Sequence, residues 1–96
     1  MPIGVIAKLT VQQGKNAEFE SIFSRLAAEV NSKESGCNFY ALHQSRTDRQ
    51  SYVVLEQYSD EEALALHGKT DHFRSAGAEL ASCLAAAPEI EYFDAV

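Results

Sequence analysis

The sequence predicts an α+β fold of the ferredoxin-like type, in the order β-α-β-β-α-β, and three observations favour it. Apolar residues follow the period of two of a strand in four segments, at residues 2–11, 37–45, 51–58 and 89–96. Apolar residues recur at offsets of three and four, as in amphipathic helices, after the first and after the third of these segments. The two β-α-β halves have similar lengths. We therefore expect an antiparallel sheet with its helices on one face.

The first strand and the first helix have the clearest patterns. In the strand, the side that carries Lys8 is the less apolar of the two, and Gln13-Gly14 ends the alternation. The helix that follows is expected to end at Ser35-Gly36. Its apolar stripe consists of Phe19, Ile22, Phe23, Leu26, Ala27 and Val30.

The second and third strands are expected to form a hairpin. The polar run 46–50 separates them and predicts the connecting loop. One side of the third strand carries an acid among aromatic and apolar residues, namely Tyr52, Val54, Glu56 and Tyr58.

The second helical region is expected to have two parts. Ser59 and Glu62 fit a capping box for a short helix that Gly68 ends, and Thr70 can cap a second segment. The alanine run before Pro88 is expected to close this segment. Its apolar stripe consists of Phe73, Ala76, Gly77, Leu80 and Leu84.

Length and composition exclude several classes of protein. The 96 residues, 46% of them hydrophobic, predict one globular domain over 1–96. A net charge of −6 argues against nucleic acid and anionic membrane surfaces as partners. No apolar run reaches the ~20 residues that span a bilayer, and no secretory signal pattern is visible. The two cysteines, Cys37 and Cys83, are therefore expected to be free thiols in the cytoplasm.

The side of the sheet without helices would also carry apolar and aromatic residues. Such a large apolar patch usually marks an association surface. The sequence therefore predicts a two-fold homodimer in which two sheets close face to face into an α/β barrel.

The residues that could carry chemistry cluster between residues 56 and 72. His67 is either a packed core histidine or a general base or acid facing a cavity. His72, in the first turn of a helix, is either a surface or capping residue or a neutral imidazole near a site. Glu56 either pairs with Lys8 or Arg46 at the dimer interface or orients His67 or a substrate hydroxyl.

Other site types have little support in the sequence. The four tyrosines are more typical of core or interface, and His43 of a sheet rim. No motif typical of a metal, nucleotide, flavin or nicotinamide site is present, so we expect no metal and no cofactor.

The central segment resembles the antibiotic biosynthesis monooxygenase family. The matching residues are Leu55-Glu56-Gln57-Tyr58, Ser59 to Leu64, His67, and Thr70-Asp71-His72-Phe73, with Gly14 and Gly36 as further matches. Asp71 stands where the family commonly has proline. The resemblance covers nearly the whole chain.

The resemblance implies a dimeric α/β barrel with a pocket between sheet and helices in each subunit. It also implies, as in quinol monooxygenases, oxygenation of a phenol or quinol without metal or prosthetic group. A base removes the phenolic proton, and the anion then passes an electron to O2. In this interpretation His67 is the base and Glu56 orients it, while Tyr58, Phe73 and His72, the last at the pocket mouth, contact an aromatic or quinone-like substrate.

Other branches of the family leave alternatives open. Haem-degrading relatives need residues that this chain replaces by Ala7, His67 and Gly77. A branch that isomerises a small phosphorylated hydroxyketone shares the strand glutamate and both histidines. A non-catalytic dimer that binds a small ligand is a third possibility.

Overall fold

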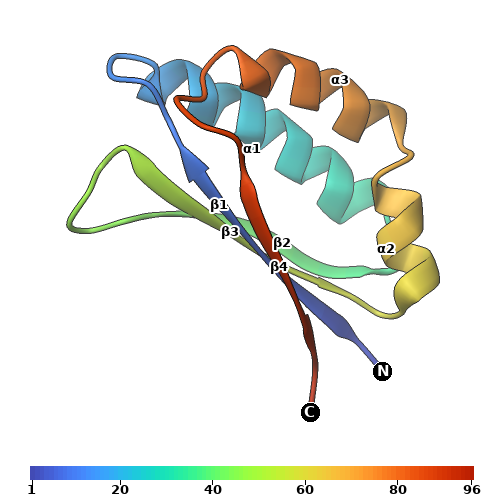
Figure 1. Cartoon of the computed structure of the whole chain (residues 1–96). Coiled ribbons are helices and arrows are strands. Elements are labelled where there is room, and N and C mark those ends of the chain that lie inside the picture. The colour runs from blue at the N-terminus through green and yellow to red at the C-terminus, as the bar shows by residue number, and fades with distance from the viewer.

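A computed structural model describes all residues of the chain, 1–96. Its helices and strands, in chain order, are β1 (Ile3–Thr10), α1 (Asn16–Lys33), β2 (Cys37–Gln44), β3 (Ser51–Tyr58), α2 (Glu61–His67), α3 (Asp71–Ala81) and β4 (Glu89–Asp94). The strands form one antiparallel sheet in the order β2-β3-β1-β4. All three helices cover the same face of the sheet (Figure 1). The predicted α+β ferredoxin-like fold is confirmed.

The alternation in β1 and β3 sorts their side chains between the two faces of the sheet. In β1 the residues Ile3, Val5, Ala7 and Leu9 are buried beneath the helices, whereas Lys8 is exposed on the other side. In β3 every second residue from Tyr52 to Tyr58 is buried, as the period of two predicts. Glu56 is therefore on the helix-covered face, because it lies two residues from both Val54 and Tyr58.

Helix α1 supplies most of the helical side of the core. Phe19, Phe23 and Val30 are almost completely buried on the stripe that the sequence predicts. The Phe23 ring stacks on Tyr40 of β2 with centroids 5.5 Å apart, and the Phe19 ring lies 4.8 Å from that of Tyr52. Such aromatic pairs stabilise a core beyond the area they bury. These two contacts fix the position of α1 against β2 and β3.

The start of α2 differs from the prediction. The N-cap is Asp60, whose carboxylate accepts a hydrogen bond from the Ala63 backbone N–H at 2.8 Å, and not Ser59. The Ser59 backbone N–H instead donates to the Gly36 carbonyl at 2.8 Å, which continues the strand end. Gly36 packs so closely that a Cβ there would lie 2.5 Å from the Ala63 Cβ. This contact needs glycine.

The end of α3 also differs from the prediction. The Thr70 side chain caps the helix as expected, by accepting from the Phe73 N–H. The helix ends at Ala81, however, before the alanine run. Leu84 forms an isolated bridge with Val11, and the Ala85 N–H donates to the Thr10 carbonyl at 2.8 Å. Pairing with the end of β1 thus takes this segment out of the helix.

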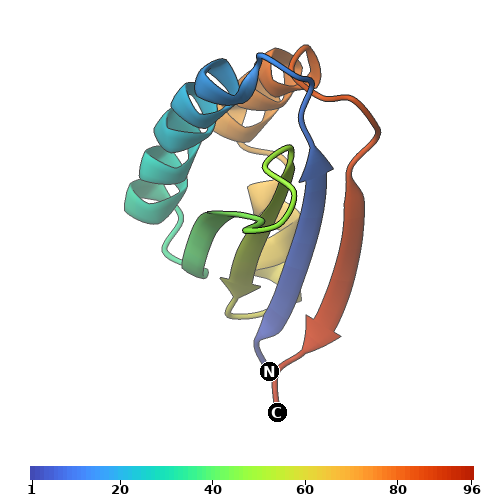
Figure 2. The same cartoon turned by 90° about the vertical axis from the view of Figure 1, so that its left-hand side faces the viewer.

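The face of the sheet opposite the helices carries no other layer (Figure 2). Ile6, Phe39 and Phe93 lie on it and are each about two-fifths exposed, at 39%, 45% and 42%. We call these three residues, with Leu55 between them, the outer apolar patch. None of the three helices has the length and apolar composition needed to cross a membrane.

Candidate functional site

A cavity of about 580 Å³ lies between the sheet and the helices. Most of its lining is apolar, since 16 of the 21 lining residues are hydrophobic, and none is a lysine or an arginine. Ile90 and Tyr92 of β4 belong to the lining but are 53% and 61% exposed, so the cavity opens at this edge of the sheet. Concave, largely apolar sites with a few polar groups are typical of small-molecule pockets.

Three buried polar side chains, Tyr40, Glu56 and His67, lie together in the cavity wall. Tyr40 and Glu56 are direct partners across the β2–β3 ladder. The His67 ring comes from the last residue of α2 and lies 5.2 Å from Tyr40, centroid to centroid. Tyr58 at 5.2 Å and Phe73 at 4.6 Å complete an aromatic surround of the imidazole. The surround holds the ring in one orientation.

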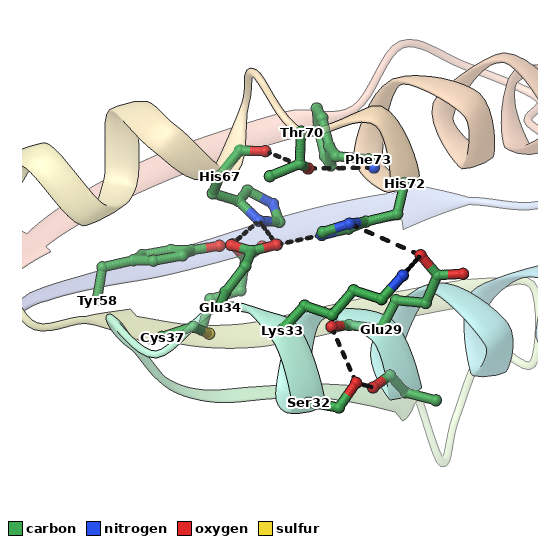
Figure 3. A network of polar contacts seen from close by, with 12 residues as sticks. Glu29, Ser32, Lys33, Glu34, Cys37, Tyr58, His67, Thr70, His72 and Phe73 are labelled. Carbon is green, nitrogen blue, oxygen red and sulfur yellow. Dashed lines mark hydrogen bonds and ion pairs between the residues drawn. The ribbon is translucent and has the colours of Figure 1, made fainter.

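The imidazole of His67 is also held by a carboxylate. Its Nδ1 lies 2.9 Å from Oε1 and 3.1 Å from Oε2 of Glu34, the residue that caps the C-terminus of α1. On the other side of this carboxylate, Nε2 of His72 lies 2.5 Å from Oε2 (Figure 3). Glu34 thus joins two histidines from α2 and α3. No group of three or more histidine, cysteine or acidic residues is placed to hold a metal ion.

These contacts favour one tautomer of a neutral His67. An ionised carboxylate only accepts hydrogen bonds, so a bond from Nδ1 to Glu34 requires the proton on Nδ1 and leaves the lone pair on Nε2. Nε2 has no hydrogen-bond partner in the protein. Every fully enclosed side-chain nitrogen and oxygen does have a partner, so Nε2 is not fully enclosed. Nε2 is therefore open to the cavity. Burial lowers the pKa of His67 below its usual value, and the nearby Glu34 carboxylate opposes this effect.

Glu56 has a different environment. The Tyr58 hydroxyl donates to its Oε1 at 2.7 Å. Burial raises the pKa of Glu56 to about 7; the bond from Tyr58 opposes this shift, and the charge of Glu34 adds to it. Near neutral pH this carboxyl group can therefore hold or release a proton. The pKa of Tyr40 is also raised, by burial first and then by the charges of Glu56 and Glu34, so its hydroxyl stays protonated.

The structure brings together some of the residues singled out from the sequence and separates others. His67, Glu56 and Phe73 line the cavity, whereas Tyr58 lies behind it and contacts two of its lining residues, Glu56 and His67. His72 is not among the lining residues; its ring contacts Glu34 instead.

The suggested ion pairs of Glu56 are absent as well. Lys8 points to the opposite face of the sheet, and the hydrogen-bond partner of Glu56 is Tyr58, not a basic residue. His43 is exposed on β2, where its Nδ1 lies 3.2 Å from the Ala41 carbonyl oxygen, which agrees with a structural role at the sheet rim.

Two residues of the site were missed from the sequence. The sequence predicts Tyr40 as a core or interface residue, but its hydroxyl has no protein partner and is open to the cavity. The sequence pattern does not mark Glu34 at all. One signal could have revealed it, because an acid at a helix C-terminus opposes the helix dipole and needs another reason to be there.

Similarity to known proteins shows which family the chain belongs to. The sequence model of the antibiotic biosynthesis monooxygenase family matches residues 2–79. The chain belongs to this family. No match was found among curated protein sequences.

Solved structures resemble the chain over nearly its whole length. A crystal structure from Caulobacter crescentus CB15, which bears the family's name, shares 50% identity at a TM-score of 0.97, covering 99% of this chain and 90% of the other. A conserved protein from Methanosarcina mazei Go1 shares 32% identity at a TM-score of 0.91, covering 97% and 91%. A variant of SnoaB, a cofactor-independent oxygenase from Streptomyces nogalater, shares 26% identity at a TM-score of 0.86, covering 98% and 92%.

Proposed function

We propose that the protein is a cofactor-independent monooxygenase that oxidises a phenol- or quinol-like substrate with O2. One observation carries the proposal: His67 presents a free Nε2 to an apolar cavity while its Nδ1 is held by a carboxylate. This is the arrangement that a general base needs. The family, and the similarity to a cofactor-independent oxygenase, add independent support.

The proposed reaction needs only O2 and a proton acceptor. His67 Nε2 takes the proton of a substrate hydroxyl, and the resulting anion transfers one electron to O2. The substrate radical and superoxide combine to form a carbon–oxygen bond, and the peroxide takes the proton back from His67. Loss of the ring C–H proton with cleavage of the O–O bond leaves a carbonyl group and releases water. A quinol and O2 thus give a hydroxyquinone and water.

The other polar groups of the cavity suit an oxygenated ring. Glu56 and the Tyr40 hydroxyl can bond a second oxygen of the substrate, and the Phe73 ring offers an apolar face to an aromatic ring. An apolar lining solvates a phenolate poorly, and the less stabilised anion gives up an electron to O2 more readily.

The isomerase alternative has less support. A phosphorylated substrate needs cationic or backbone donors, and the lining has no lysine or arginine while Glu34 adds negative charge next to His67. An uncharged aromatic molecule suits this lining better.

We also propose that the protein is a homodimer joined through the outer apolar patch. Ile6, Phe39 and Phe93 lie there on one face of the sheet that no other layer covers, and a large exposed apolar patch usually marks an association surface. Phe93→Asp would put a charge into this contact. Sedimentation should then show a dimer for the natural chain and a monomer for the variant; a natural chain that is monomeric at micromolar concentration would exclude the dimer.

Oxygen uptake with a panel of reduced quinones and polycyclic phenols tests the activity. His67→Asn should lower kcat by about 10²- to 10⁴-fold, the usual share of a general base. His43→Asn is the matched control, because His43 is an exposed histidine outside the cavity, and it should retain full activity. Equal uptake by both variants would dismiss His67 as the base. Ligand-induced melting shifts without any oxygen uptake would instead indicate a binding protein.

A further inference from the structure

We propose that Glu34 is a positioning residue that keeps His67 in the Nδ1–H tautomer and stabilises its imidazolium, and that His72 holds the Glu34 carboxylate in place. The inference rests on the proposed function, since it concerns the same histidine. It assigns a role to an acid that does not line the main cavity and that the sequence pattern did not mark.

The first step of the argument is the position of Glu34. It follows the last turn of α1, and its backbone N–H still donates to the Val30 carbonyl at 3.0 Å. Only 11% of its side chain is exposed. A buried carboxylate is costly unless hydrogen bonds compensate for its lost hydration. The two histidines are the side-chain partners that supply them.

The second step is that both carboxylate oxygens have a histidine partner. Oε1 lies 2.9 Å from Nδ1 of His67, and Oε2, which is also 3.1 Å from that nitrogen, lies 2.5 Å from Nε2 of His72. With both oxygens bonded, the carboxylate cannot rotate without losing a partner. Nδ1 of His72 lies 3.7 Å from Glu29, whose carboxylate lies 3.4 Å from Lys33 (Figure 3). The chain of contacts thus runs from the cavity to the surface.

The third step is the spacing of the two histidines. Thr70 accepts from the Phe73 N–H with its hydroxyl oxygen and donates the same hydroxyl to the His67 carbonyl at 2.9 Å. This bond fixes the turn between α2 and α3. Glu34 can therefore meet both rings at once.

The chemical consequence concerns the charge that forms on His67. When Nε2 accepts a substrate proton, Nδ1–H remains bonded to Glu34, and the positive charge arises beside the carboxylate. The titratable groups around the ring are Glu34, Glu56, His72, Tyr40 and Tyr58. Of these, Glu34 is the carboxylate in direct contact with the ring, so it is the main source of stabilisation.

The first experiment reads the tautomer directly and needs no substrate. Nitrogen-15 NMR of the three histidines, assigned with His43→Asn and His72→Asn, should show a protonated Nδ1 and a bare Nε2 on His67. Glu34→Gln should mix the tautomers and lower the titration midpoint of His67 by about one unit or more, because an opposite charge is lost. Glu61→Gln is the control, because Glu61 is an exposed acid of α2 outside this chain of contacts, and it should leave His67 unchanged.

The second experiment measures activity. Glu34→Gln should lower kcat by about 10²-fold or more with little change in KM, the pattern of a lost stabilisation of the charged state. Glu34→Asp, which keeps the charge, should recover part of the rate, and His72→Asn should retain more activity than His72→Phe because asparagine can still donate to Glu34.

The outcomes separate this inference from the proposed function. An unchanged His67 tautomer and midpoint in folded Glu34→Gln would overturn the inference. So would full activity of that variant alongside an inactive His67→Asn, which would leave the oxygenase proposal standing. The expected NMR changes without turnover of any quinol would instead count against the oxygenase and keep the positioning role of Glu34.

Discussion

Glu34 and Glu56 are both largely buried acids close to His67, but they lie in different regions and have different partners. Glu34 ends a helix and binds two imidazoles, whereas Glu56 sits inside a strand and binds one phenol. Burial raises the pKa of Glu56 to about 7. A buried acid with basic partners is suited to carry a lasting charge, and one with a phenol partner is suited to exchange a proton. The comparison teaches that the partners, more than burial alone, decide what each acid can do.

The largest expected effect is that two matched substitutions change the free energy of unfolding in opposite directions at pH 8. The Glu34 carboxylate accepts from both His67 and His72, whereas the amide of Glu34→Gln can accept from only one of them and turns its NH₂ group toward the other donor. This substitution should lower the free energy of unfolding by about 2–3 kcal/mol. Glu56→Gln removes a charge that burial disfavours, and it should leave the free energy unchanged or raise it. Urea unfolding of both variants checks this. Destabilisation of equal size would break the comparison.

The second prediction concerns the pH dependence of stability. Because the pKa of Glu56 rises from 4.5 to about 7 on folding, the folded chain keeps a proton that the unfolded chain has lost between these values. Its contribution to stability is therefore complete below about pH 4.5 and falls as the pH rises to 7, by up to about 3 kcal/mol. This pH dependence is opposite to that of a carboxylate whose pKa is lowered on folding, which loses its stabilising effect as the pH falls.

Urea midpoints between pH 4.5 and 8 test this difference, with Glu56→Gln as the reference that lacks the titrating group. The fall in stability should be steeper for the natural chain than for the variant. Parallel curves would mean that Glu56 titrates normally.

The smallest expected effect concerns Tyr58. Its hydroxyl donates to Glu56 and thereby opposes the rise in the pKa of that carboxyl. Tyr58→Phe should therefore raise the pKa of Glu56 further and cost about 1 kcal/mol of stability. Carbon-13 NMR titration of the Glu56 carboxyl group measures the shift. The Glu34 contacts with the histidines should not change, which His67 nitrogen shifts can verify.

Much of the fold could be predicted because it depends on local periodicity. The alternation from Tyr52 to Tyr58 and the stripe from Phe19 to Val30 each appear on the predicted face. The errors lie where two local choices compete. Ser59 and Asp60 can both cap a helix, and only the pairing of the Ser59 N–H with Gly36 decides between them. Alanines favour a helix, yet bonding to the end of β1 draws Ala85 away from it.

The candidate site was predicted less completely. His67, Glu56 and Phe73 could be found because they lie in one short segment of recognisable pattern, and they line the cavity. Glu34 lies 33 positions before His67 in the chain, and its role depends on a contact between elements. No local pattern encodes such a contact.

By itself, the sequence determined where strands and helices form and which side of each is apolar, because backbone geometry converts residue spacing into faces. Only the tertiary structure decided the partners of the polar groups. It placed the end of α1 beside the junction of α2 and α3, turned His72 toward Glu34, and left His67 Nε2 free in the cavity. The physical reason is that the energy of a buried charge depends on the groups within a few ångströms, and packing alone selects those groups.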